Sequence, residues 1–176
     1  MSKIINTVKK YKKTSLLILV ILLVIAFIIT VSVLFSSKNE SYIRYDDFKT
    51  PTRIIKYTYH NDKVIKQESS ISTPYNLLKK TQEQAKFSYS GVSGQLKNIK
   101  GISSTIDFEK SVVLEKVMVN FNAVSKNDLK KYQQIMAENG VPISSSNSLK
   151  ESEKLLKSDG FLSFEEYNNK KEEQQP

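Results

Sequence analysis

Five lysines in two separate segments are the clearest candidates for a chemical role in this sequence. Their ammonium groups, if brought together, would form a cationic patch with Tyr132 nearby, suited to the anionic polymers of a cell surface. Binding of that kind weakens steeply as salt is added, which gives a direct test. We favour the alternative, in which these lysines form the solvated faces of two helices. The candidate polymer-binding residues are Lys97, Lys100, Lys126, Lys130 and Lys131.

The sequence shows no catalytic constellation. The single histidine, His60, lies in the turn sequence His60-Asn61-Asp62 with no carboxylate pair nearby, so we expect an exposed loop residue. The many serines include no GxSxG sequence, the signature of a nucleophile elbow. We therefore predict that the protein is not an enzyme and holds no metal ion or cofactor.

Three pairs of neighbouring carboxylates are weak candidates for acid–base chemistry. Glycoside hydrolysis needs two carboxyl groups held about 5–9.5 Å apart across a cleft. Nothing in the sequence places two carboxylates in this way, so we predict that each pair is a solvated surface feature. The pairs are Asp46–Asp47, Glu151–Glu153 and Glu165–Glu166.

Composition excludes further classes of protein. The chain has 176 residues and no cysteine, which rules out a disulfide framework, a thiolate metal site and a lipidated N-terminal cysteine. The formal net charge is +9, but residues 1–37 hold five lysines and no acid, and the remainder holds 22 basic and 18 acidic residues. Because this remainder has no basic block of five or more, we predict that it does not bind nucleic acid.

An uncharged apolar stretch, Ser15 to Phe35, dominates the N-terminal part of the chain. It has 21 residues, and about 20 apolar residues in a helix cross a bilayer core. The preceding lysines place residues 1–14 in the cytoplasm by the positive-inside bias. We therefore predict a single-pass, uncleaved signal anchor with the C-terminal domain outside the cell membrane. A cleaved signal peptide is the alternative, but the stretch is longer than an h-region and its exit lacks a small-x-small site.

The residues after this stretch predict two β-hairpins. Residues 36–50 are polar and mixed, and we expect a linker there. Residues 53–59 and 64–72 are rich in β-branched and aromatic side chains around the turn at His60 and predict the first hairpin. Residues 102–108 and 112–121 alternate apolar and polar positions and predict the second. In the last run Glu115 falls on the apolar face, so we expect it near an end or rim.

Three segments with helical spacing accompany the hairpins. Residues 75–89 predict an amphipathic helix of about four turns after the capping pair Thr73-Pro74. Residues 126–138 and 149–158 each follow a capping serine and present one apolar face. Residues 165–176 are charged and nearly without apolar groups, so we expect a disordered tail.

The predicted fold class is α+β. One N-terminal transmembrane helix precedes a small domain, residues 51–164, in the order β-β-α-β-β-α-α. The two hairpins join into a four-stranded antiparallel sheet, and about three helices cover one face while the other faces water.

Three segments together resemble a known family. They are the first hairpin RIIKYTYHNDKVIKQESS, the run NIKGISSTIDFEKSVVLEKVMVNF with its Gly-centred entry to the second hairpin, and the closing SLKESEKLLKSDGF. In these the stretch 53–164 resembles the YehR-like family of small bacterial lipoproteins. The resemblance implies an envelope-anchored α+β domain of no established activity and gives no catalytic residues. The chain departs from the family in lacking the lipidated cysteine.

These observations favour a membrane-anchored, extracytoplasmic binding or accessory protein of the bacterial cell envelope. We expect its partner to be a protein at the outer surface of the membrane, and the sequence is silent on small molecules. Two alternatives remain open. One is an immunity protein that neutralises a secreted toxin at the membrane. The other is capture of an anionic envelope polymer through the five lysines.

Overall fold

The computed structural model describes residues 21–27, 36–44 and 52–173. It divides into two compact units, Met1–Ser36 and Ser37–Pro176. In the first unit residues 21–27 are helical and their side chains are exposed. No helix among the described residues is long and apolar enough to cross a membrane. The predicted transmembrane helix is therefore not found, and most of the stretch 15–35 lies outside the described residues.

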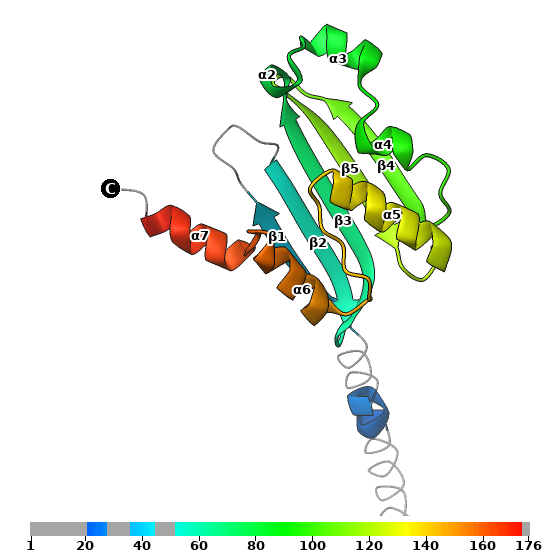
Figure 1. Ribbon diagram of the computed structural model, residues 1–176. Coiled ribbons are helices and arrows are strands. Elements are labelled where there is room, and N and C mark those ends of the chain that lie inside the picture. The colour runs from blue at the N-terminus through cyan, green and yellow to red at the C-terminus, as the bar shows by residue number, and fades with distance from the viewer. Residues whose placement is uncertain (1–20, 28–35, 45–51, 174–176) are drawn as a thin grey trace, which may run out of the picture. The chain divides into compact units, whose positions relative to one another are not determined.

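The second unit contains a six-stranded antiparallel sheet, not the four-stranded sheet predicted (Figure 1). The strand order is β4-β5-β3-β2-β1-β6. Both predicted hairpins are present, as β2–β3 and β4–β5, and β3 pairs with β5 to join them. The strands described are β1 (Lys38–Arg44), β2 (Thr52–His60), β3 (Lys63–Pro74), β4 (Ile102–Phe108), β5 (Val112–Asn120) and β6 (Leu162–Ser163).

The two additional strands come from segments in which no strand was predicted. Strand β1 lies within the predicted linker and aligns antiparallel with β2, so that Tyr42 stands opposite Ile55. Tyr42 is buried in the core, whereas Asn39 is exposed at the start of the strand. Strand β6 is only two residues long and pairs with Tyr42 and Ile43 of β1. The rest of the predicted linker, 45–50, lies outside the described residues.

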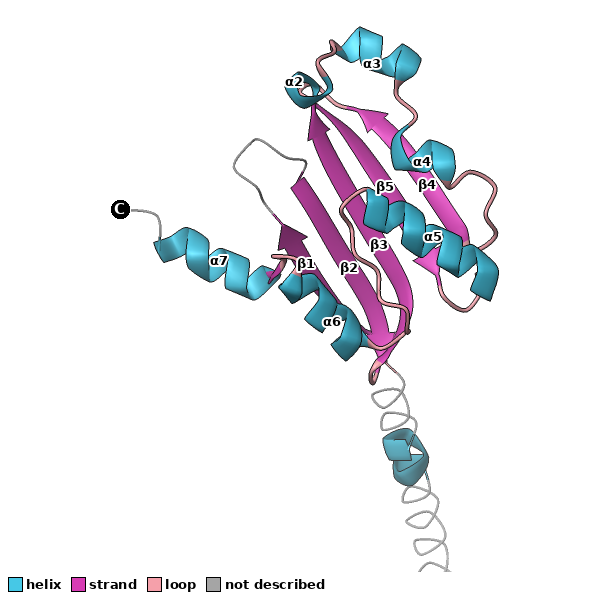
Figure 2. Cartoon of the chain, in the orientation of Figure 1, coloured by secondary structure: helices cyan, strands magenta, loops and turns pink. Residues whose placement is uncertain are grey.

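Helices cover one face of the sheet (Figure 2). Helices α4, α5 and α6 lie over this face, α2 and α3 lie at one end of the sheet, and α7 extends beyond the β1 edge. Helices α5 and α6 have the predicted bounds. The helices of the second unit are α2 (Tyr75–Leu78), α3 (Gln82–Ser88), α4 (Gly91–Gln95), α5 (Lys126–Glu138), α6 (Leu149–Ser158) and α7 (Phe164–Glu173).

One predicted helix and the predicted disordered tail differ from the structure. The segment 75–89 is broken because Lys79 adopts a left-handed backbone (φ 52°), and a new helix begins at Thr81. The Thr81 hydroxyl accepts the Gln84 N–H while the Gln84 side chain accepts the Thr81 N–H. The tail predicted to be disordered forms α7 as far as Glu173, and its first turn is fixed by Glu166, which accepts the Ser163 N–H at 2.7 Å.

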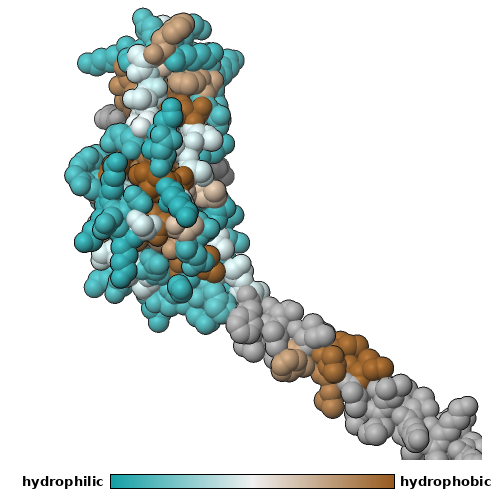
Figure 3. Space-filling model, turned by 90° about the vertical axis from the view of Figure 1, so that its right-hand side faces the viewer, coloured by the Kyte–Doolittle hydropathy of each residue, from teal (hydrophilic) through white to brown (hydrophobic). Residues whose placement is uncertain are grey.

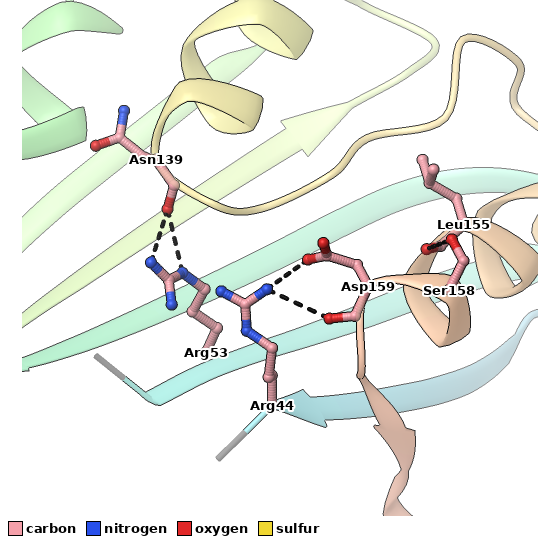
Figure 4. Close-up of polar contacts among 6 residues, drawn as sticks. All are labelled: Arg44, Arg53, Asn139, Leu155, Ser158 and Asp159. Carbon is pink, nitrogen blue, oxygen red and sulfur yellow. Dashed lines mark hydrogen bonds and ion pairs between the residues drawn. The ribbon is translucent and has the colours of Figure 1, made fainter. Parts of the chain in front are cut away.

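Two arginines attach the ends of the covering helices to the sheet (Figure 4). Arg53 of β2 donates from Nε and Nη2 to the carbonyl of Asn139 at the end of α5, at 3.1 and 3.0 Å. Arg44 of β1 donates to the Asp159 carbonyl at 3.4 Å and pairs with the Asp159 carboxylate at the end of α6. Cations are favourable at helix C-termini, by about 0.3–1 kcal/mol each. These contacts fix where α5 and α6 lie on the sheet.

The core lies between the covered face and the helices. Its largest fully buried side chains include Tyr57, Tyr132, Phe161 and Leu156. A smaller cluster of Tyr75, Ala85 and Val113 lies at the end near α2 and α3. The other face carries polar side chains with scattered exposed apolar ones, as predicted for a sheet with one wet face.

Candidate binding site

The five candidate lysines lie on the flank formed by α4, α5 and their connections. Lys97 and Lys100 follow α4, and the other three occupy the first two turns of α5. All five are exposed, and none has an ion-pair partner among the described residues. Figure 3 shows the flank carrying α4 and β4 as mainly hydrophilic, with a narrow apolar strip between polar side chains. None of the five lysines lines either cavity described below.

Tyr132, expected beside these lysines, cannot take part in a surface patch. Its side chain is fully buried, and its hydroxyl accepts a hydrogen bond from Gln67 Nε2 at 3.0 Å. Burial also raises the pKa of Tyr132, since the phenolate would lose its hydration. Tyr132 therefore adds no aromatic surface to these lysines.

A different region provides a cavity with convergent polar groups. It lies between the start of β1, the tip of the β2–β3 hairpin and the first turns of α6, and its volume is about 590 Å³. We call it the β1–α6 cleft. Its lining residues are Glu40, Tyr42, Tyr59, Asn61, Asp62, Leu149, Lys150 and Glu153.

The floor of the β1–α6 cleft is fixed by Asp62. The carboxylate of Asp62 accepts the Ser148 hydroxyl at 2.7 Å and the Lys150 N–H at 2.9 Å, and its carbonyl accepts the Leu149 N–H at 2.8 Å. The hydrogen bond from Ser148, followed by that from Lys150, lowers the pKa of Asp62. The predicted turn at His60-Asn61-Asp62 is confirmed, and this turn clamps the hairpin onto the N-terminus of α6.

One wall of the cleft is a buried tyrosine pair. Tyr42 is 1% exposed, and its ring meets that of Tyr57 edge-on at 6.1 Å between centroids. The hydroxyl of Tyr42 has no hydrogen-bond partner among the described residues, although Tyr42 lines the cleft. Burial raises the pKa of Tyr42, and the negative charges of Glu153 and Glu40 raise it further. A hydroxyl that faces a cleft without a protein partner can hydrogen-bond to a bound ligand.

The cleft is acidic in a chain that is basic overall. Three carboxylates, from Glu40, Asp62 and Glu153, face one ammonium, that of Lys150. Glu40 has no ion-pair partner in the described part of the chain. Glu153 shares Lys157 with Glu166, at 3.2 and 3.1 Å. The cleft therefore carries net negative charge that its own side chains do not neutralise.

A second cavity, of about 250 Å³, lies on the open face of the sheet. It is lined mainly by short hydroxyl side chains of β3 and β4, with Met118 beneath them. Its two charged residues are already paired: Lys116 with Asp107 at 3.4 Å, and Glu68 with Lys66. The β1–α6 cleft is thus the better candidate, because it is larger and keeps groups without partners.

The one fully buried carboxylate among the described residues lies outside both cavities. Glu115 is 1% exposed, so the expectation that it lies near a rim was wrong. Its carboxylate accepts the Tyr89 hydroxyl at 2.6 Å and the Ser93 N–H, in the first turn of α4, at 3.0 Å. Burial, and then the hydrogen bond to Glu115, raise the pKa of Tyr89. These contacts attach α4 to the sheet.

The other carboxylates considered for chemistry are dispersed. Glu151 lies exposed on α6, Glu165 is exposed on α7, and Asp46–Asp47 lies outside the described residues. His60 is the last residue of β2 and is half-buried. No three histidine, aspartate or glutamate side chains among the described residues converge to hold a metal ion. Among the described residues, these side chains therefore do not converge on one site.

Sequence reasoning missed the β1–α6 cleft because its wall lies in the segment taken for a linker. The signal was present in the alternation of Glu40 and Tyr42, which predicts a common face if residues 38–44 are extended. Glu153 was considered only with Glu151. On a helix these two residues point in different directions, and only Glu153 faces the cleft.

The fold is that of a small α+β domain with an antiparallel sheet. The chain belongs to the family described as a protein of unknown function, DUF1307, whose model matches residues 39–162. This confirms the resemblance to YehR-like proteins. The solved structure of the E. coli YehR protein has the same fold, with a TM-score of 0.59 and 23% sequence identity, covering 74% of this chain and 94% of that one.

Two relatives come from Listeria. The chain is 37% identical over 112 residues to the uncharacterized lipoprotein Lin0239 of Listeria innocua, covering 63% of this chain and 72% of the relative. It is 30% identical over 108 residues to the uncharacterized lipoprotein Lmo0207 of Listeria monocytogenes, covering 61% and 69%. Both relatives are named as lipoproteins without an assigned activity.

Proposed function

We propose that this protein is a non-enzymatic binding module that works outside the cytoplasm. Its domain is held at a membrane surface. The two Listeria relatives are lipoproteins, a class held at a membrane surface, and this supports the location. Attachment confines the domain near the bilayer and raises its effective concentration for partners that are held there too.

The observation that carries the proposal is the β1–α6 cleft. Binding sites are concave and place a few unsatisfied polar groups among apolar walls. The Tyr42 hydroxyl and the Glu40 carboxylate are such groups, because neither has a partner among the described residues. The partner that we propose is a protein at the outer membrane surface, which makes the domain an accessory to it. If that protein is a secreted toxin, the same cleft would serve an immunity role.

A second candidate function is capture of an anionic envelope polymer. The observation in its favour is that Lys97, Lys100 and the three lysines of α5 are all exposed and have no ion-pair partner among the described residues. Such binding would be lost steeply as salt is added. It would not depend on the cleft.

Site-directed photo-crosslinking in intact cells tests the proposal. A photoreactive phenylalanine replaces Lys150 at the rim of the cleft, or Lys154 on the same helix and outside the cleft. A protein adduct at 150 that is absent at 154 supports a partner bound at the cleft. Equal adducts at both positions, or none at 150, would overturn it. An adduct with polymer at Lys130 alone would instead support the second candidate.

Location needs its own measurement. Protease added to intact cells whose outer layers have been removed is expected to digest the domain while a cytoplasmic marker survives. Protection of the domain until the membrane is broken would contradict an extracytoplasmic location.

A further inference from the structure

We propose that the β1–α6 cleft binds a cationic side chain, lysine or arginine, carried by an extended peptide segment that lies along the edge of β1. This inference rests on the proposed binding function and names the chemistry of its ligand.

Charge gives the first argument. Glu40 and Glu153 are both half-buried at the cleft, where the interaction between charges is screened less than in bulk water. Glu40 lacks an ion-pair partner among the described residues, and Glu153 has only a shared one in Lys157. Lys150 stands at the rim as the one opposing charge. An ammonium or guanidinium group between Glu40 and Glu153 would neutralise both.

The aromatic side chains give a second, independent argument. Tyr42 is almost completely buried, yet its hydroxyl has no hydrogen-bond partner in the described ranges and lines the cleft. A tyrosine hydroxyl accepts hydrogen bonds as well as donating them, so it suits a ligand that carries only donors. Tyr59 adds a half-buried ring. Tyrosine rings attract cations, and they do so more strongly where water is excluded.

The edge of the sheet explains why the ligand is a peptide. Strand β6 pairs only with Tyr42 and Ile43 of β1, so the outer edge of Lys38–Ser41 has no strand partner among the described residues. Such an edge offers backbone N–H and C=O groups to an added strand. Side chains alternate along a strand, so Glu40 and Tyr42 face the same side as the cleft. A strand added here would direct every second side chain over it.

Titration of a fluorescent peptide tests this inference. The purified full-length chain, held in a neutral detergent, is titrated with a short peptide of alternating lysine and serine, and binding is followed by fluorescence anisotropy. We expect saturable binding that weakens with added salt. A peptide in which glutamate replaces each lysine is expected not to bind. Free spermidine supplies the charge without the backbone, so it is expected to compete only weakly.

Two matched double variants test whether the peptide binds at the β1–α6 cleft. The double substitution Glu40→Gln and Glu153→Gln is expected to lower affinity for the lysine peptide about tenfold or more, since two nearby charges are lost. Glu83→Gln with Glu165→Gln removes the same charge from exposed positions outside the cleft and is expected to change affinity by less than about twofold. Tyr42→Phe, which removes only the unpaired hydroxyl, is expected to weaken binding by a smaller factor.

Three outcomes would overturn the inference. The lysine peptide does not bind, the two double variants lose affinity equally, or spermidine competes as well as the peptide. The third outcome would mean that the cleft binds cations and that no peptide strand is added at the β1 edge. If the peptide fails while photo-crosslinking at position 150 still captures a protein, the proposed function stands and only the cationic ligand is wrong.

Discussion

The hydroxyl of Tyr89 donates a 2.6 Å hydrogen bond to the buried carboxylate of Glu115. The two residues belong to the segment after α3 and to the middle of β5, so this bond ties a run of short helices to the centre of the covered face. Among the described residues, Glu115 accepts hydrogen bonds from this hydroxyl and from the Ser93 N–H, and it has no cationic partner there. Hydrogen-bond donors therefore compensate its burial.

Removing the Tyr89 hydroxyl should destabilise the domain. Tyr89→Phe leaves an oxygen of a buried carboxylate without its donor, at a cost of about 1.5–3 kcal/mol for a hydrogen bond to a charged group. Chemical denaturation of the two proteins measures the difference. Tyr167→Phe on α7, where no hydrogen bond of the hydroxyl is seen among the described residues, should change stability by less than about 0.5 kcal/mol. Equal effects would mean that the bond to Glu115 contributes little.

Gly91 should tolerate no side chain. A Cβ atom there would lie 2.6 Å from Glu115 Cδ, and the residue has φ of +46°. Gly160 has φ of +82°, but a Cβ there would have its nearest neighbour at 4.0 Å. Gly160→Ala should therefore cost only the left-handed strain, about 1–2 kcal/mol, and Gly91→Ala clearly more. Thermal unfolding of both variants gives the comparison, and similar losses would show that α4 moves aside freely.

Asp62 should make stability depend on pH in the acid range. Its pKa is lower in the folded chain than the ordinary value of 3.8, chiefly through the hydrogen bond from Ser148. Its contribution to stability is thus present above the unfolded pKa and is lost as the pH falls through the folded pKa. Melting temperatures between pH 6 and pH 2 should fall less steeply for Asp62→Asn than for the native chain. Glu166, whose pKa is also lowered, will leave a residual slope in both.

Buried tyrosines should make the domain unfold in alkali. Burial raises the pKa of Tyr57 to about 12 and also raises that of Tyr132. The neutral phenols therefore contribute stability that is fully present below their unfolded pKa, near 10, and is lost as the pH rises toward the folded values. Absorbance of phenolate should show an early group of exposed tyrosines and a late, cooperative group that titrates with unfolding. A single smooth titration of all nine tyrosines near pH 10 would contradict this.

The periodic spacing of apolar residues predicted the regular helices and strands well. It did not predict the position of elements whose polar residues face the core. Strand β5 and helices α5 and α6 alternate or repeat clearly, and their bounds were predicted within one residue. The buried face of β3 carries the polar residues Gln67 and Ser69. The sequence therefore did not indicate that β3 is an inner strand of the sheet. The amide nitrogen of Gln67 donates hydrogen bonds to Ser69 and Tyr132, while its amide oxygen has no partner among the described residues. Such partners come from distant parts of the chain and leave no local signal.

The cleft escaped prediction for a related reason. Glu40, Asp62 and Glu153 lie far apart in the sequence and come together only when β1 pairs with β2 and α6 is capped by the hairpin tip. The lysines considered as a candidate patch lie in two short runs of the sequence, 97–100 and 126–131. Charges that are grouped along the chain can be seen in a sequence, whereas carboxylates that only folding brings together cannot.

The two-residue strand β6 has a consequence for how the domain is made. Ile43 of β1 pairs with Leu162 of β6, which is synthesised 119 residues later. A chain emerging from the ribosome or a translocation channel must therefore hold β1 without its outer neighbour until almost the whole domain has appeared. Closing so long a loop is entropically slow. During that interval the backbone of Tyr42 and Ile43 lacks the strand that pairs with it in the folded domain.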